Sequence, residues 1–279
     1  MASNWENFLK NLGEWRGSFT KISRDGEILD STPSILNLEG FDNNQAVLFR
    51  LRRFDSSNYD SPPIQDYQQE YRYLGKENIF FATGAFSKGT LQLAPFSEFG
   101  AEYGFVDDNR RSRLVQLYDQ QGNFINLTLI REFRSSTDAY ERPQLTGEQL
   151  IGTWQGQAHT VYSDLRQSEI FPTYLEVQKI GDGYLEQKLS FQSQIITAKA
   201  RIEGNKIISE TEGIPRQILL LPDGTSSNVP LQLELRKPFF LEAGWLVREN
   251  ERQRLIRSYS EKGEWISSTH IIEYKIENI

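Results

Sequence analysis

Most of the chain alternates between hydrophobic and polar residues with a period of two, the pattern of β-strands that bury one face. Such alternation occupies residues 45–54, 67–74, 79–83, 124–133, 174–180, 184–191, 195–202, 229–236 and 265–274. Pairs such as Asp25-Gly26, Gly122-Asn123 and Lys262-Gly263 separate the runs and are typical of hairpin turns. We expect about eight to ten strands in each half of the chain, paired antiparallel without helical crossovers.

The N-terminal segment predicts one short helix. Ser3 and Glu6 have the spacing of a capping box, and Gly13 stands where a helix could end. The hydrophobic residues between them follow helical spacing and form one stripe: Trp5, Phe8, Leu9 and Leu12. We expect this helix to close one end of a barrel. A shorter version is predicted at residues 146–149.

The chain contains an internal repeat at about half its length. The motif apolar-Gly-x-Trp-x-Gly occupies residues 12–17 and again residues 151–156. A second block, residues 105–114, corresponds to residues 246–255 in the same order. Two matching blocks at nearly the same offset indicate a tandem duplication.

Domain boundaries follow from this repeat. We expect one domain over residues 1–138 and a second over residues 145–279, joined by a polar stretch that ends in Pro143. A long antiparallel sheet tends to curl and close, because closure removes its unpaired edges. The predicted fold class is all-β: two tandem up-and-down β-barrels with a short N-terminal helix.

Composition narrows the functional classes. A net charge of −7 does not favour nucleic acid, which is bound mainly through clustered Lys and Arg. The chain has no cysteine, which excludes disulfides and thiolate sites. Its only histidines are His159 and His270, and one imidazole on a barrel face does not make a metal site. We therefore expect no metal and no cofactor, and whether the protein is an enzyme stays open.

The chain also lacks the sequence features of export and membrane insertion. No apolar run approaches the roughly 18 residues that a membrane-spanning helix needs. The N-terminus has no basic region followed by an apolar stretch, so we expect no signal peptide and a cytoplasmic location.

The most distinctive polar cluster of the first half comprises Arg50, Arg52, Arg53, Tyr71, Arg72 and Tyr73. Four of these residues are candidates for ligand binding: Arg50, Arg52, Tyr71 and Arg72. One interpretation is a solvated outer face of the sheet. The other is that an arginine enters the lumen and pairs with a ligand carboxylate through a charge-assisted bond. Arg113 and Arg254, on late strands of the two halves, are further candidates.

The repeated motif resembles the signature of the lipocalin, or calycin, superfamily. The matching residues are Gly13 and Trp15 in the first half and Gly152 and Trp154 in the second. The resemblance implies that each tryptophan is structural and closes the narrow end of a barrel. It also implies that a late-strand arginine packs over each ring.

The late-strand arginine has two candidates in each half. They are Arg111 or Arg113 in the first half and Arg252 or Arg254 in the second, and the sequence does not choose between them. Such packing is a cation–π interaction, worth at most about 2 kcal/mol when desolvated.

The whole chain further resembles an uncharacterised cyanobacterial family with two calycin-like domains. It is more distantly similar to lipocalin-like phycobilin lyases, which bind a linear tetrapyrrole. Those lyases commonly carry a histidine after the motif tryptophan. Here only the second half offers one, His159, so the lyase pattern is incomplete.

The leading hypothesis is that a barrel lumen binds a small hydrophobic or amphipathic molecule, with a tetrapyrrole and a lipid as candidates. One alternative is chromophore handling like that of a bilin lyase or isomerase. The other is a protein-interaction module whose barrels are filled by side chains. The sequence names neither a catalytic residue nor an oligomeric state.

Overall fold

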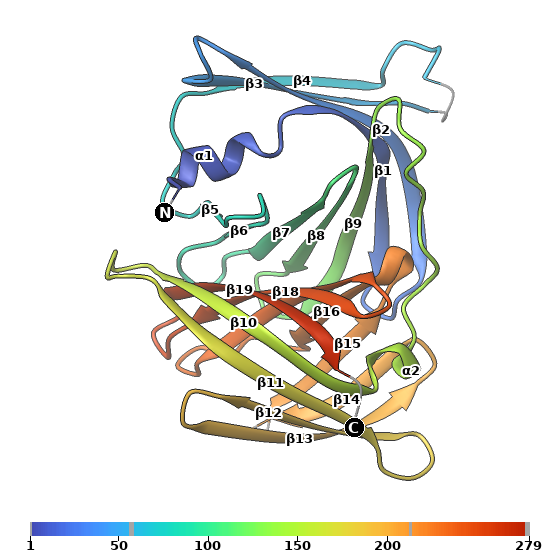
Figure 1. Ribbon diagram of the computed structural model, residues 1–279, viewed down its shortest axis with the longest axis vertical. Helices are drawn as coiled ribbons and strands as arrows, with labels where there is room; N and C mark the ends of the chain where they lie inside the picture. The colour runs from blue at the N-terminus through green and yellow to red at the C-terminus, as the bar shows by residue number, and fades with distance from the viewer. Residues whose placement is uncertain (1, 56–58, 212–213, 277–279) are drawn as a thin grey trace. The chain divides into compact units, whose positions relative to one another are not determined.

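The computed structural model describes residues 2–55, 59–211 and 214–276. The all-β prediction is confirmed, because the chain forms one nine-stranded sheet and one closed ten-stranded antiparallel barrel (Figure 1). The strand numbers agree with the eight to ten expected for each half. Among the described residues, no helix has the length and hydrophobicity needed to span a membrane.

The first sheet curls but does not close. Its strands are β1 (Gly13–Ser23), β2 (Ile28–Phe41), β3 (Ala46–Arg53), β4 (Gln65–Tyr71), β5 (Ile79–Phe80), β6 (Phe86–Gly89), β7 (Phe99–Asp107), β8 (Arg110–Tyr118) and β9 (Phe124–Arg134). Their order is β4-β3-β2-β1-β9-β8-β7-β6-β5, which leaves β4 and β5 as the two edges. The expected closed barrel is therefore a curled half-barrel in this half of the chain.

The second sheet closes, because β10 pairs with both β11 and β19. Its strands are β10 (Gly152–Tyr162), β11 (Glu169–Lys179), β12 (Tyr184–Phe191), β13 (Gln194–Glu203), β14 (Lys206–Thr211), β15 (Ile214–Leu220), β16 (Thr225–Pro230), β17 (Phe239–Arg248), β18 (Glu251–Tyr259) and β19 (Trp265–Ile276). A single 3₁₀ turn, η1 (Pro222–Gly224), stands between β15 and β16.

One strand explains the difference between the two sheets. In the barrel, β14 bridges β13 and β15, whereas residues 72–78 connect β4 to β5 without forming a strand. Helix α1 (Asn4–Leu9) instead lies beside β5 (Figure 1). Asn4 accepts a bond from the Phe80 amide at 2.7 Å, and the Asn7 side chain donates to the Phe80 carbonyl at 3.1 Å. Side chains of the helix thus occupy edge positions that a strand occupies in the barrel.

Both short helices begin as predicted. Ser3 and Glu6 form the capping box of α1, which ends at Leu9 rather than near Gly13. Gly13 instead opens β1 with a φ of 129°, because the chain must turn there from helix into sheet. Helix α2 (Gly147–Leu150) is the shorter counterpart, with Thr146 at its N-cap.

The chain packs into two compact units that interleave along the sequence. Unit 1 comprises residues 1–89, 102–116 and 126–141, and unit 2 comprises residues 90–101, 117–125 and 142–279. Unit 2 therefore contains two segments from the first half of the chain. The last change from unit 1 to unit 2, after residue 141, lies near the predicted join of the repeats.

These two segments are bonded into unit 2 by matching contacts. The Tyr118 hydroxyl donates to the Pro230 carbonyl at 2.9 Å, and the Tyr259 hydroxyl donates to the Thr90 carbonyl at 2.8 Å. The predicted hairpin turn at Gly122 accepts a backbone bond from Leu233 at 2.8 Å. Because buried backbone groups need partners, unit 2 requires these residues of the first half.

The second glycine of the repeated motif has a packing reason. A Cβ atom at Gly17 would lie 1.8 Å from the carbonyl oxygen of Arg131 on β9. A Cβ atom at Gly156 would lie 2.5 Å from the carbonyl oxygen of Ile272 on β19. Backbone atoms cannot swing aside as a flexible side chain can, so both positions need glycine.

We expect Gly156→Ala to lower the free energy of unfolding by at least about 1–3 kcal/mol, the usual cost of overpacking. The matched control is Gly147→Ala, whose Cβ would meet only the Ile202 side chain, at 3.4 Å. Urea denaturation followed by circular dichroism measures both. Equal midpoints for the two variants would contradict the packing argument.

Candidate ligand-binding cavity

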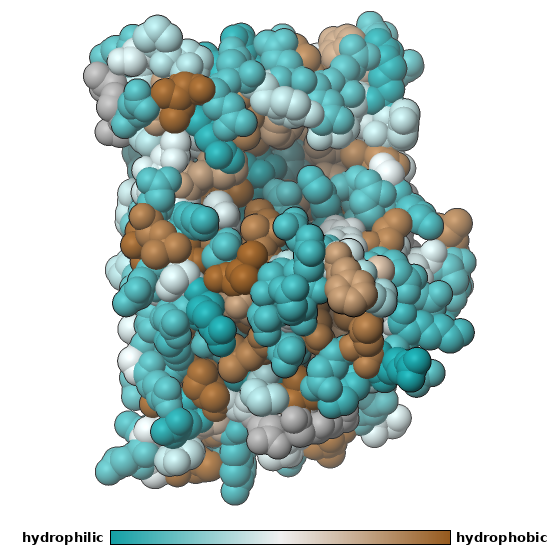
Figure 2. Space-filling view, turned by 180° about the vertical axis from the view of Figure 1, so that it is seen from behind, coloured by the Kyte–Doolittle hydropathy of each residue, from teal (hydrophilic) through white to brown (hydrophobic). Residues whose placement is uncertain are grey.

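Unit 1 contains a partly open cavity of about 330 Å³ that is lined by residues of its sheet and of α1. Most of its wall is hydrophobic or aromatic and includes Phe8 of α1, Phe49 and Leu51 of β3, and Tyr71 of β4. The molecular surface in Figure 2 is mainly hydrophilic with scattered hydrophobic groups, and a recess is visible in the upper third of the view.

Aromatic side chains from four elements hold this wall together. The Phe8 ring lies 5.9 Å from the ring of Tyr71 and 5.1 Å from that of Phe80. The rings of Phe49 and Tyr71 lie 6.1 Å apart in an edge-to-face arrangement. Such pairs contribute beyond their buried area. Helix α1 thus forms part of the cavity wall, as well as covering the edge of β5.

The other end of the cavity is charged. Arg113 of β8 forms a two-pronged pair with Glu132 of β9, with N···O distances of 3.0 and 2.8 Å. Its third nitrogen, Nη1, donates to Glu102 of β7 at 3.0 Å. Lys88 of β6 lies 3.3 Å from the same Glu102 carboxylate. The arginine is buried and its donors are directed at two carboxylates.

These pairs keep the charged end ionised at neutral pH. Burial acts to raise the pKa of Glu102, but the charges of Lys88 and Arg113 hold it below its ordinary value. Burial acts to lower the pKa of Arg113, but the carboxylates of Glu132 and Glu102 raise it above its ordinary value. The side chains of Lys88, Glu102 and Arg113 therefore form a stable ionic cluster.

Arg111 lines the same end of the cavity, but some of its hydrogen-bond donors have no acceptor. It is only 5% exposed, and its Nη1 lies 3.4 Å from Glu132 without forming a hydrogen bond. Two of its nitrogens, Nε and Nη1, are buried without an acceptor in the described part of the chain. Burial lowers the pKa of Arg111 to about 10; the Glu132 carboxylate acts to raise this pKa, and the charge of Arg113 acts to lower it. The side chain is still a cation at neutral pH.

Unit 2 carries the corresponding set of residues, Glu242, Arg252, Arg254 and Glu273, inside its barrel. Arg254 contacts Glu273 at 3.0 Å and Glu242 at 3.3 Å. Arg252 donates its Nε to Glu273 in a short bond. The duplication therefore preserved the ionic cluster, and the two copies differ in how the first arginine is paired.

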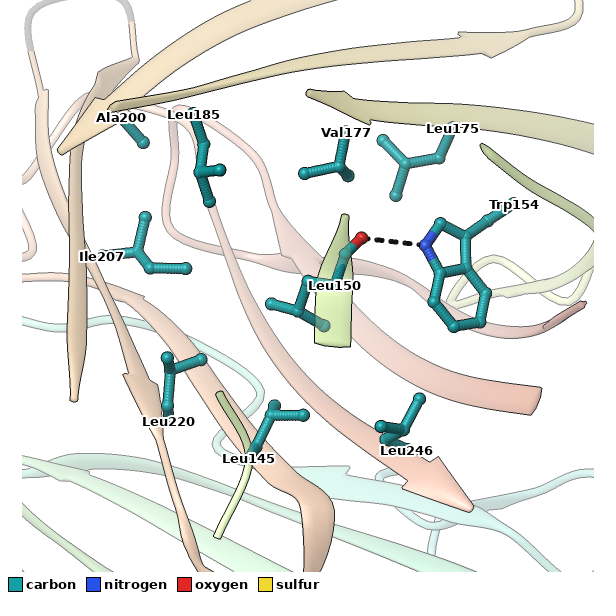
Figure 3. Close-up of a cluster of buried hydrophobic side chains, with 10 residues drawn as sticks. All are labelled: Leu145, Leu150, Trp154, Leu175, Val177, Leu185, Ala200, Ile207, Leu220 and Leu246. Carbon is teal, nitrogen blue, oxygen red and sulfur yellow. Dashed lines mark hydrogen bonds between the residues drawn. The ribbon is translucent and has the colours of Figure 1, made fainter. Parts of the chain in front are cut away.

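The motif tryptophans are fully buried and bonded alike. Trp15 donates its indole N–H to the Asn11 carbonyl at 2.9 Å, and Trp154 donates to the Leu150 carbonyl at 3.0 Å (Figure 3). Arg111 lies 5.8 Å from the Trp15 ring, and Arg252 lies 4.9 Å from the Trp154 ring. In each half, the first arginine of the two candidates is thus the one beside the tryptophan.

A residue of the last strand joins each tryptophan as well. Arg134 lies 4.3 Å from the Trp15 ring, closer than Arg111, and Lys275 lies 5.2 Å from the Trp154 ring. Arg113 lies instead 5.4 Å from the ring of Phe19. Sequence reasoning considered only one cation per ring and missed the contribution of the last strand.

The structure brings together two of the predicted ligand-binding residues. Tyr71 and Arg113 both line the cavity. Arg254 occupies the corresponding cluster of unit 2. Whether any of the three contacts a ligand stays a prediction.

The other three predicted residues lie outside the cavity lining. Arg50 is half-buried and pairs with Asp66 at 2.6 Å. Arg72 is exposed and pairs with Asp42 at 3.0 Å and with Glu70. Arg52 donates to the Asn37 side chain at 2.9 Å. These contacts agree with a solvated outer face, the first of the two interpretations given above.

Four residues near the charged end were not chosen from the sequence as candidate ligand-binding residues: Arg53, Lys88, Glu102 and Arg111. Arg53 was detectable, since alternation places it on the face of Phe49 and Leu51, and its guanidinium lies 4.1 Å from the Phe19 ring. Lys88 and Glu102 come together only through the pairing of β6 with β7. Arg111 was considered only as a support for the tryptophan.

The two histidines are neighbours, which the sequence did not show. His159 of β10 stands opposite His270 of β19 in the strand register. The His270 Nε2 lies 3.0 Å from Gln253 Oε1, and the ring is buried. Within the described ranges, no three His, Asp or Glu side chains are placed to hold a metal ion.

Comparisons with known proteins fit this architecture, a curled open sheet followed by a closed barrel. Residues 1–137 match the N-terminal family model of a domain of unknown function, DUF3598. Residues 141–276 match the C-terminal domain of "biogenesis factor required for ATP synthase 1". No match was found among curated proteins.

A solved structure identifies the family. A DUF3598 protein of unknown function from Nostoc punctiforme is 46% identical, with a TM-score of 0.92, and the alignment covers 99% of this chain and 100% of that one. The chain belongs to the DUF3598 family, which confirms the predicted resemblance to an uncharacterised cyanobacterial family.

A more distant similarity links the chain to a lyase. The S-type phycobiliprotein lyase CPES from Guillardia theta is 11% identical, with a TM-score of 0.38, over 47% of this chain and 91% of that one.

Proposed function

We propose that the protein binds a small amphipathic molecule in the cavity of unit 1. The observation that carries this proposal is an apolar cavity of about 330 Å³ with one charged end. At about 30 Å³ for each water-sized group, the space holds a molecule of roughly eleven non-hydrogen atoms. Pockets of this kind, mostly apolar with a few polar groups, are typical of small-molecule sites.

The open edge of the first sheet supports placing the ligand in unit 1. Because β4 and β5 are not joined, the concave face is reachable without unfolding a strand. The barrel of unit 2 is packed with hydrophobic side chains at its tryptophan end. There Leu145 and Leu150 point among hydrophobic side chains of the surrounding strands (Figure 3).

We expect decanol, a neutral probe of suitable length, to bind the purified protein with one site in isothermal titration calorimetry. Leu51→Trp places an indole ring in the cavity wall, where it fills part of the space. We expect this variant to bind decanol about tenfold more weakly. Phe49→Trp is a second filling variant, should the first unfold. Leu165→Trp is the control, since Leu165 is 89% exposed and lies in unit 2.

Failure of decanol to bind the wild-type protein would overturn the proposal, as would equal binding by the filling variants and the control. A linear tetrapyrrole in the same titration tests the bilin alternative through a change in its absorbance spectrum. Transfer of that pigment to an acceptor cysteine would indicate a lyase rather than a carrier.

A second candidate function follows from the family match of residues 141–276, whose printed description is a biogenesis factor required for ATP synthase. In that case unit 2 acts in the assembly of this enzyme. Binding of the full chain to purified ATP synthase subunits, measured by size-exclusion chromatography, tests the idea. Separate elution of the chain from every subunit would remove this candidate.

A further inference from the structure

We infer that the charged end of the unit 1 cavity is a carboxylate subsite, in which Arg111 binds the head group of the ligand. This inference rests on the proposed function and specifies the chemical class of its ligand: a monocarboxylate with an apolar tail.

The first argument is the state of the Arg111 side chain. It lines the cavity, is 5% exposed, and keeps Nε and Nη1 without an acceptor among the described residues. Buried donors are nearly always paired, because leaving one unpaired is costly. A carboxylate has two oxygens in one plane and can bond one edge of the guanidinium, Nη2 together with either Nε or Nη1.

The second argument is that Arg113 cannot take this role. Its Nε, Nη1 and Nη2 already donate to Glu132 and Glu102. Glu132 is held by Arg113 at hydrogen-bonding distance, so it offers Arg111 only the 3.4 Å contact. Both carboxylates therefore bond to Arg113, and Arg111 is left available to a ligand.

The third argument comes from the duplicated copy. In unit 2, Arg252 occupies the position of Arg111, but its Nε is bonded to Glu273, and Nη2 is its buried nitrogen without an acceptor among the described residues. The same four residue types are thus paired more completely in the closed barrel. The unsatisfied Nε and Nη1 belong to the copy that also has the open edge.

The fourth argument is the balance of charge. The cations Lys88, Arg111 and Arg113 line this end of the cavity. The acids Glu102 and Glu132 contact them. The cluster has an excess of one positive charge, which one carboxylate neutralises. Arg53, whose pKa is lowered by burial and by the charge of Arg113, stands near and adds to the positive potential.

The position of the tail follows from the wall. The Phe86 ring lies 5.9 Å from the Arg111 guanidinium, and Phe49, Leu51 and Tyr71 continue the lining. A head group on Arg111 therefore leads its tail along the aromatic wall towards α1. Each methylene buried there adds to the binding.

The experiment compares decanoate, decanol and decyl phosphate on the wild-type protein by isothermal titration calorimetry. We expect decanoate to bind at least about tenfold more tightly than decanol, because it gains a charge-assisted pair with Arg111. Tighter binding of decyl phosphate than of decanoate would overturn the carboxylate assignment.

The same titrations on Arg111→Gln are expected to abolish the preference for decanoate over decanol. Arg50→Gln is the matched control, since Arg50 lies on the same sheet but pairs with Asp66 outside the cavity lining. Thermal melting checks that each variant folds. Should Arg111→Gln unfold, Arg111→Lys keeps the charge and should show a preference smaller than that of the wild-type protein.

The outcomes separate the two proposals. Decanol binding that depends on Leu51, without any preference for decanoate, would overturn the carboxylate subsite and leave the cavity function standing. An unchanged preference in Arg111→Gln would do the same. Absence of binding by all three probes would overturn both.

Discussion

Replacement of Glu273 by alanine is expected to lower the free energy of unfolding by about 3–5 kcal/mol, the usual cost of breaking a buried ion pair from one side. Glu273 is fully buried and contacts both Arg252 and Arg254. Burial acts to raise its pKa, but the two arginines hold the pKa below its ordinary value, so the carboxylate is charged. Its removal leaves two buried cations with too few acceptors.

Urea denaturation followed by circular dichroism measures this loss. Glu234→Ala is the control, because Glu234 also forms an ion pair, with Lys237 at 2.7 Å, but both side chains are about half exposed. We expect the control to change the free energy by less than about 0.5 kcal/mol. Similar losses in the two variants would show that burial of the cluster does not matter.

Lowering the pH from 7 to 5 is expected to destabilise the protein by about 2 kcal/mol through His270 alone. Burial lowers the pKa of His270 to about 3, and His159 contributes to that shift. An unfolded chain has a histidine pKa near 6.5 and therefore binds the proton first. The stabilisation is present above about pH 6.5 and is lost as the pH falls towards 3.

The measurement is the free energy of unfolding at pH 7, 6 and 5, where most carboxylates stay ionised. His270→Gln should flatten this dependence, because the variant has no imidazole to protonate. His159→Gln should keep most of the pH dependence of the free energy of unfolding, since His159 is only half-buried. A wild-type slope unchanged in His270→Gln would assign the acid sensitivity to other groups.

The candidate site shows where sequence reasoning succeeded and where it stopped. Arg113 and Tyr71 were chosen from the pattern, and both line the cavity. Arg50 and Arg52 were chosen over Arg53, although alternation with Phe49 and Leu51 places Arg53 on the inner face. A period of two separates the faces of a strand, but only a packed partner shows which face is inside.

Arg111 illustrates a different limit. The sequence showed two arginines two positions apart on one strand, and therefore on one face. Which of them pairs with Glu132, and which lies beside Trp15, depends on side-chain geometry within the sheet. The unsatisfied nitrogens of Arg111 appear only when the acceptors from β7 and β9 are in place.

By itself, the sequence determined the strand pattern, the capped helices and the duplication, because these depend on local spacing and on direct matching of residues. Only the tertiary structure decided that the second copy closes while the first stays open. Closure depends on whether two distant strands find a bridging strand. Here β14 bridges β13 and β15, whereas residues 72–78 form no strand and leave β4 and β5 apart.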